Sequence, residues 1–143
     1  MNKRCFLLFA FLCCFALPSW TQEIICEGEK DGVIMLSVLE ANITKEDAVA
    51  QSIKDAYSQL LFRGIPDSKN NKQALLETDE SVMEKNYKYY ENLISIGHLY
   101  SFINYSVLTH YKKKQAVVKL TLNIQALIED LQKNHLYRRF GLH

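Results

Sequence analysis

The sequence predicts an α+β fold, in which helices pack on one face of a small, mostly antiparallel, three-stranded sheet. Residues 115–124 alternate between apolar and polar side chains, which is typical of a half-buried antiparallel strand. Residues 33–39 are apolar on both faces, which indicates a covered strand. Two segments between these strands repeat apolar residues at helical spacing. The expected order of elements is β-α-α-β-β-α.

The first expected helix has recognisable start and stop signals. Thr44 precedes Lys45-Glu46-Asp47, a variant of the capping box, in which a hydroxyl and a carboxylate satisfy free backbone N–H groups. Gly64 and Pro66 then end the helix. Residues 66–73 are polar and rich in turn formers, so we expect a mobile loop there.

A second helix is expected to begin near Asp79 or Ser81 and to end before Gly97. Its Met83, Tyr87, Tyr90 and Ile94 share one apolar stripe, which predicts core packing and leaves Tyr89 as the exposed aromatic side chain that could contact a glycan or a peptide.

The remaining chain predicts a hairpin and a helix. Residues 99–111 and 115–124 form the two strands, with the polar residues 112–114, all lysines, at the tip. A last helix is expected over residues 126–135. No internal repeat or second boundary is visible, so residues 22–143 are expected to form a single domain.

The first 21 residues have the order of parts of a secretory signal peptide. Lys3 and Arg4 precede an unbroken apolar run over residues 5–17, and small and turn-forming residues follow. The run is about half the roughly 20 residues that a membrane-spanning helix needs, and no second long run follows. We therefore expect cleavage before Gln22 and export to the periplasm or the exterior, with no transmembrane segment in the mature chain. The residues before Cys13 and Cys14 do not fit a bacterial lipid-attachment site.

Charge and cysteine content further narrow the possible partners of the protein and the ways in which it can be stabilised. The formal charge is +1 for the whole chain, and loss of Lys3 and Arg4 with the leader leaves 15 basic and 16 acidic groups, or −1. A nearly neutral chain has no electrostatic preference for nucleic acid or anionic lipid. Of the four cysteines only Cys26 lies beyond the leader, so no intramolecular disulfide is expected. A free cysteine usually packs as a small hydrophobe, with a nucleophile or an intermolecular bridge as the alternatives.

Two patterns in the sequence contain residue types that bind metal ions. Glu27-x-Glu29-x-Asp31-Gly32 resembles the first half of a calcium loop, but Val38 stands where a bidentate carboxylate is required. His98 and His110 are twelve residues apart, or about 40 Å along a strand, so they cannot share a metal. His135 and His143 have no spacing that defines a site.

No catalytic signature is present either. The chain has no Gly-x-Ser-x-Gly, no His-Glu-x-x-His and no glycine-rich phosphate loop, and its five glycines are scattered at expected element ends. The sequence therefore assigns no catalytic, cofactor-binding or metal-binding residue and predicts no cofactor.

Residues 48–64 (AVAQSIKDAYSQLLFRG) resemble a group of exported proteins from Bacteroidales-type bacteria with an alanine-rich first helix that ends in a Leu-Phe-x-Gly-like turn. The resemblance continues at residues 100–103 and 117–127. The group is similar in layout to the N-terminal domain of flagellar assembly protein T and related small envelope lipoproteins. The resemblance implies an α+β accessory module of the bacterial cell envelope without known catalysis.

Two classes of function are compatible with these observations. The first is a non-enzymatic, exported envelope accessory or interaction module whose partner is another cell-envelope protein. The alternative is a small ligand-binding protein or hydrolase whose site assembles from residues far apart in the sequence. A cavity lined by convergent polar groups favours the second class, and a filled core with an exposed apolar or aromatic patch favours the first.

Overall fold

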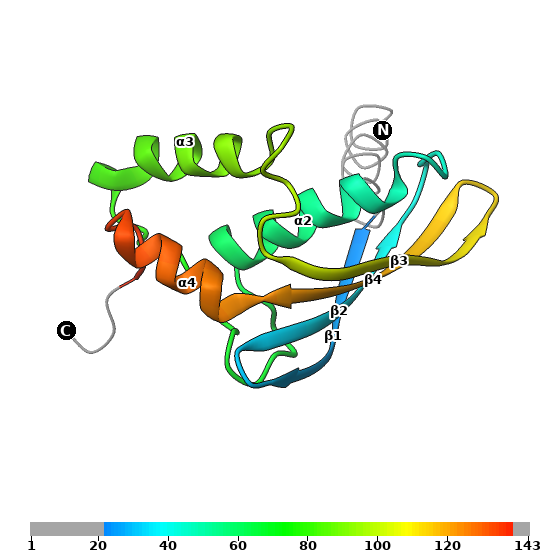
Figure 1. The fold of residues 1–143 in the computed structure, drawn as a ribbon, viewed down its shortest axis with the longest axis horizontal. Coiled ribbons are helices and arrows are strands. Elements are labelled where there is room, and N and C mark those ends of the chain that lie inside the picture. Colours follow the sequence, from blue (N-terminus) through cyan, green and yellow to red (C-terminus); the bar gives the residue numbers. More distant parts are fainter. Residues whose placement is uncertain (1–21, 139–143) are drawn as a thin grey trace, which may run out of the picture.

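A computed structural model describes residues 22–138 as three helices and a four-stranded sheet (Figure 1). The strands are β1 (Gln22–Lys30), β2 (Val33–Glu40), β3 (Ile103–Lys112) and β4 (Gln115–Asn123), and they lie in the order β1-β2-β4-β3. Every neighbouring pair is antiparallel. The helices are α2 (Ala48–Phe62), α3 (Met83–Leu93) and α4 (Ile124–Lys133), and a short 3₁₀ turn, η2 (Glu80–Val82), leads into α3.

The α+β class is confirmed, but the prediction of a three-stranded sheet with the order β-α-α-β-β-α is wrong. The described chain begins with an additional strand, β1, so the order is β-β-α-α-β-β-α. β1 and β2 are joined by the two-residue turn Asp31-Gly32, in which both residues have positive φ (54° and 76°). An Asp-Gly pair is a strong hairpin signal because a two-residue turn of this kind matches the twist of the flanking strands. The turn was not recognised as a hairpin because the acidic residues of β1 interrupt the apolar pattern expected of a strand before it.

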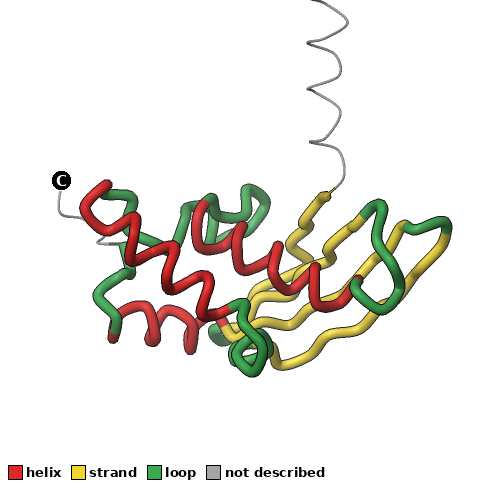
Figure 2. Tube along the Cα trace, turned by 90° about the horizontal axis from the view of Figure 1, so that it is seen from above, coloured by secondary structure: helices red, strands yellow, loops and turns green. Residues whose placement is uncertain are grey.

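One layer of helix covers one face of the sheet. α2 packs on β2, β3 and β4, and Figure 2 shows α2 over the sheet while α3 and α4 lie beyond one end of it. The buried residues of α2 recur at helical spacing: Ala48, Ser52, Ile53, Ala56, Tyr57, Leu60 and Leu61. They meet the alternate buried residues of the central strands: Ile34, Leu36 and Val38 of β2, and Ala116, Val118, Leu120 and Leu122 of β4.

Tyr57 is the largest fully buried side chain of this core, and its hydroxyl has hydrogen-bond partners. Its hydroxyl donates a hydrogen bond to the Leu99 carbonyl (2.8 Å) and accepts one from the Phe102 backbone N–H (3.4 Å). Burial raises the pKa of this phenol to about 12. Tyr57 thereby ties α2 to the chain that enters β3.

The expected loop after α2 is confirmed, but it is firmly attached. Gly64 has φ of +83°, and a Cβ there would collide with the backbone carbonyl of Lys72, so the chain folds back closely on itself. Ser68 and Asn71 are buried, and the Asn71 N–H donates to the Ser68 hydroxyl (2.8 Å). Leu75 and Leu76 then donate backbone hydrogen bonds to the end of α2. This loop forms one wall of a cavity, described below.

Candidate binding groove

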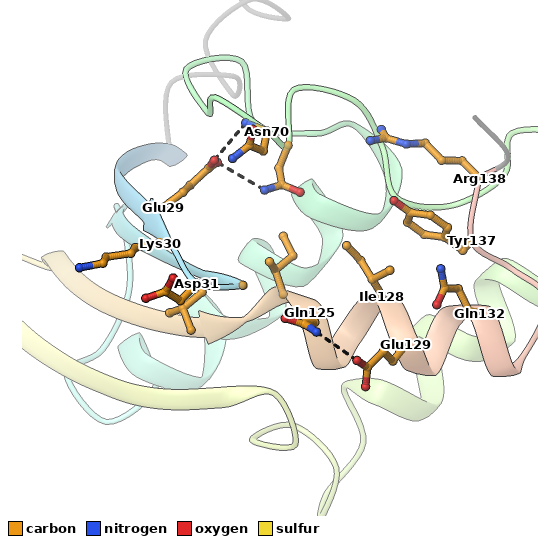
Figure 3. A pocket seen from close by; sticks show the side chains of 14 residues that line it. Glu29, Lys30, Asp31, Asn70, Gln125, Ile128, Glu129, Gln132, Tyr137 and Arg138 are labelled. Carbon is orange, nitrogen blue, oxygen red and sulfur yellow. Dashed lines mark hydrogen bonds between the residues drawn. The ribbon is translucent and has the colours of Figure 1, made fainter. Parts of the chain in front are cut away.

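A cavity lies between the β1–β2 turn, the loop after α2, α4 and the last described residues. Its volume is about 560 Å³, within the range of ligand-binding pockets. In Figure 3, Ile128 and Tyr137 point toward its middle, and Glu29 with Asn70 lies across from Arg138. Val33 and Ile124 add to its apolar surface. We call this cavity the groove.

The first wall is built on the edge strand β1. Glu29 accepts hydrogen bonds from the Asn70 backbone N–H (3.0 Å) and, through its other oxygen, from the Asn71 side-chain amide (3.4 Å). The Cys26 backbone N–H donates to an Asp67 carboxylate oxygen (3.0 Å). The contact with Asp67 gives one backbone N–H of the edge strand a hydrogen-bond partner. Together these contacts fix the loop against β1.

The floor is one side of α4. Asn123 begins the helix by accepting a hydrogen bond from the Ala126 N–H (3.0 Å). Leu127 and Leu131 are buried in the core, whereas Gln125, Ile128, Glu129 and Gln132 line the groove. The Gln125 amide donates to Glu129 (3.3 Å), as expected for residues four apart on one helix face.

The opposite wall is the segment after α4. Tyr137 forms an isolated antiparallel bridge with Leu76. The Arg138 backbone N–H donates to the Leu75 carbonyl (2.9 Å), and its guanidinium Nη1 donates to the Ala74 carbonyl (2.8 Å). Both walls are therefore held by hydrogen bonds to the loop after α2, and the groove is a formed feature of the fold.

The groove can bind by hydrogen bonds, charge and apolar contact. Its described lining contains carboxylates, primary amides, a phenol and a guanidinium, but no Ser, Thr, Cys or His. The usual nucleophile and imidazole base of hydrolases are thus missing from this lining. Amide side chains both donate and accept hydrogen bonds, so the lining suits a ligand that carries both kinds of group.

The structure separates the acidic residues that resembled a calcium loop. Glu27 lies in β1 and accepts a hydrogen bond from the Ser37 hydroxyl (2.7 Å), Glu29 contacts the loop after α2, and Asp31 lies in the turn. Among residues 22–138, no group of three His, Cys, Asp or Glu side chains could hold a metal ion. His110 lies in β3, but His98 lies in the turn before that strand, so the two do not share a strand.

Cys26 is partly buried in β1, near the Gly28 carbonyl (3.8 Å) and Glu29 (3.9 Å). Burial raises the pKa of its thiol, a hydrogen bond with the Gly28 backbone lowers it, and the neighbouring carboxylates raise it again, so that the pKa is raised overall. A raised pKa disfavours the nucleophilic thiolate. The packing role expected for this cysteine agrees with its position.

The prediction for the tyrosines of α3 is wrong in part. Tyr89 donates a short hydrogen bond to Asp130 of α4 (2.6 Å), and burial and this carboxylate raise the pKa of the phenol. Tyr87 is instead the exposed residue (54%), and its ring stacks on Phe62 at 5.4 Å. Tyr90 is partly buried as expected and also contacts Phe62. An apolar stripe of four residues on a helix cannot specify which side of the helix meets a neighbouring helix.

A pair of carboxyl groups lies beside α2, and no local pattern in the sequence indicates it. Glu40, at the end of β2, is only 8% exposed. Its pKa is raised to about 9, first by burial and then by a hydrogen bond to, and repulsion from, Asp55 of α2. A protonated, uncharged carboxyl explains how Glu40 is accommodated in the core.

Comparison with protein-family models, curated proteins and solved structures finds no match. The fold and the groove define a small α+β protein with a preformed cavity at one end of its sheet. The similarity to flagellar assembly protein T remains an expectation from the sequence.

Proposed function

We propose that this protein is an exported, non-enzymatic interaction module that holds an extended segment of another cell-envelope protein in the groove. The observation that carries the proposal is the groove itself: a cavity of about 560 Å³ whose polar walls are fixed to the fold and whose lining is suited to binding. By the expectation set out from the sequence, a cavity lined by polar groups favours the alternative class, a small ligand-binding protein. The interaction module is proposed instead because the lining, described next, suits a polypeptide segment. A small ligand is therefore the alternative outcome of the test below.

A polypeptide segment is favoured by the mixture of groups in the lining. An extended backbone presents unpaired N–H and C=O groups, and amide side chains can satisfy both. Asn70, Gln125 and Gln132 carry such amides on two sides of the groove. Ile128 and Tyr137 offer apolar contact between them.

The charges favour a segment that carries Lys or Arg. Three carboxylates line the groove, those of Glu29, Asp31 and Glu129, against two cations, Lys30 and Arg138. Lys30 points away from the middle of the groove in Figure 3, and Arg138 is engaged by the Ala74 carbonyl. Asp31 and Glu129 are exposed, so a basic side chain of a partner could reach them.

Export rests on the first 21 residues, which lie outside the described part of the chain. Every described element begins at or after Gln22, so cleavage at Thr21–Gln22 would remove none of them. Among residues 22–138 the structure contains no helix that is long and apolar enough to cross a membrane.

The expected result for protein recovered from its native host is therefore a chain that begins at Gln22. Intact-mass measurement and N-terminal sequencing check this. A chain that still begins at Met1, or an acylated Cys13 or Cys14, would contradict the predicted processing.

The binding role is tested by crosslinking in the native host. A photoreactive amino acid is placed at Asn70 on one wall of the groove or at Gln132 on its floor, and at Glu91 of α3 as a control outside it. We expect the same envelope protein to be crosslinked from both groove positions and not from Glu91. Mass spectrometry of the product identifies the crosslinked peptide, which should contain Lys or Arg.

The matched variants neutralise charge without changing shape. Asp31→Asn/Glu129→Gln should reduce the crosslink about tenfold or more, since each charged hydrogen bond is worth ~1.5–3 kcal/mol. Asn tolerates the positive φ of residue 31. Glu46→Gln/Glu91→Gln removes the same charge from exposed sites outside the groove and should have no effect. Recovery of a small metabolite in place of a protein would reject the interaction role.

A further inference from the structure

One face of the sheet has no helix over it. In Figure 1, α2 lies on one side of β3 and β4, and no described helix lies on the other side of these two strands. The strand register places on this open face the residues that alternate with the core: Glu23 and Ile25 of β1, Met35, Ser37 and Leu39 of β2, Val117, Lys119 and Thr121 of β4, and Tyr105, Val107, His110 and Lys112 of β3. Met35 is 43% exposed and Tyr105 58%.

The open face has an apolar middle and opposite charges on its two sides. Glu23 lies on the β1 side, and Glu27 joins it there because the Ser37 hydroxyl donates to its carboxylate. Lys119 and Lys112 lie on the side of β4 and β3. All four of these charged residues are exposed. The apolar Met35, Leu39 and Val117 lie between the two sides.

This arrangement is complementary to itself. A two-fold axis parallel to the strands, between β2 and β4, places the acidic side of one copy over the basic side of the other. Because Ser37 pairs with Lys119 in the register, Glu27 of one copy would lie near Lys119 of the second copy, twice by symmetry. A two-fold axis across the strands would instead oppose like charges.

We propose that the open face packs against the same face of a second copy of this chain, in a two-fold symmetric dimer. Aligned packing of two twisted sheets is a common arrangement, with side chains interdigitating across about 10 Å. Four strands at ~4.8 Å spacing and about eight residues at ~3.3 Å each give a footprint of about 500 Å² per copy. About 1,000 Å² in total is at the lower limit for a specific interface, so a weak, salt-sensitive dimer is expected.

The dimer is tested by sedimentation equilibrium of the protein as recovered after export, at low and high salt. We expect a monomer–dimer equilibrium that shifts toward monomer at high salt. Glu27→Lys and Lys119→Glu should each weaken the dimer at least tenfold, because each places like charges together twice. The double variant Glu27→Lys/Lys119→Glu should restore it, since the pair is re-formed with its signs exchanged.

Circular dichroism of each variant verifies that the fold is kept, and neither residue lines the groove, so groove binding should not change. The proposal is overturned if the protein remains a monomer up to about 1 mM, which corresponds to only about 4 kcal/mol of binding. It is also overturned if a dimer forms but neither single variant weakens it, or if the double variant does not recover.

Discussion

Replacement of Leu120 by Asp is expected to unfold the protein. Leu120 is 1% exposed and lies in β4 between Leu36 of β2 and Ser106 of β3. A carboxylate at this position would be buried without a partner, which costs several kcal/mol, beyond the loss of the leucine's packing. Because the total stability of a domain is about 5–15 kcal/mol, most or all of it would be lost. Urea titration followed by far-ultraviolet circular dichroism measures the effect.

Lys119→Asp is the matched control, one residue earlier on the same strand. Lys119 is exposed on the open face, so the free energy of unfolding should change by less than about 1 kcal/mol at a protein concentration where the chain is monomeric. If both variants were equally stable, β4 would not alternate between a buried and an exposed face, and the period of two would be misread.

Glu40→Gln is expected to stabilise the protein at pH 8 and to flatten the dependence of its stability on pH. The pKa of Glu40 is raised to about 9 in the folded state, against about 4.3 in an unfolded chain. Between these values the folded protein binds a proton that the unfolded chain releases. The contribution of Glu40 to stability is therefore full below pH 4 and falls by up to ~1.4 kcal/mol per pH unit toward pH 9.

The neutral amide of Gln needs no proton and can donate to Asp55, so the substitution should raise the free energy of unfolding at pH 8 by about 1–3 kcal/mol. Denaturant titrations from pH 5 to pH 8 compare the wild type, Glu40→Gln and Glu46→Gln. Glu46 is exposed and serves as the control for loss of a surface carboxylate. The same slope of stability against pH in the wild type and in Glu40→Gln would show that Glu40 is ionised in the fold.

The elements with a strong period could be predicted from the sequence. The alternation of residues 115–124 identified β4, and the apolar spacing after Thr44 identified α2. The helix expected to begin at Thr44 begins at Ala48 in the structure. The Thr44 hydroxyl does bond to the Asp47 backbone N–H and carboxylate, but these bonds form a turn that precedes the helix. β1 was missed because Glu27 and Glu29 dominate a segment whose alternate residues Ile24 and Cys26 face the core.

The groove could not be predicted, for a physical reason. Its walls come from β1, the loop after α2, α4 and the segment that follows, and none of these carries a local signature of binding. What brings them together is tertiary contact, such as the Arg138 hydrogen bonds to Ala74 and Leu75. The Asp31-Gly32 turn was the one local signal that pointed to this end of the sheet.

The proposed function requires that the groove binds an extended, basic polypeptide segment. The most direct measurement is a series of ¹H–¹⁵N spectra of the exported protein during titration with a blocked pentapeptide of alternating Val and Lys. The control peptide has Glu in place of each Lys. We predict saturable shifts of the side-chain amide signals of Asn70, Gln125 and Gln132 with the basic peptide alone. Absence of shifts at these residues with either peptide, or equal shifts with both, would contradict the claim.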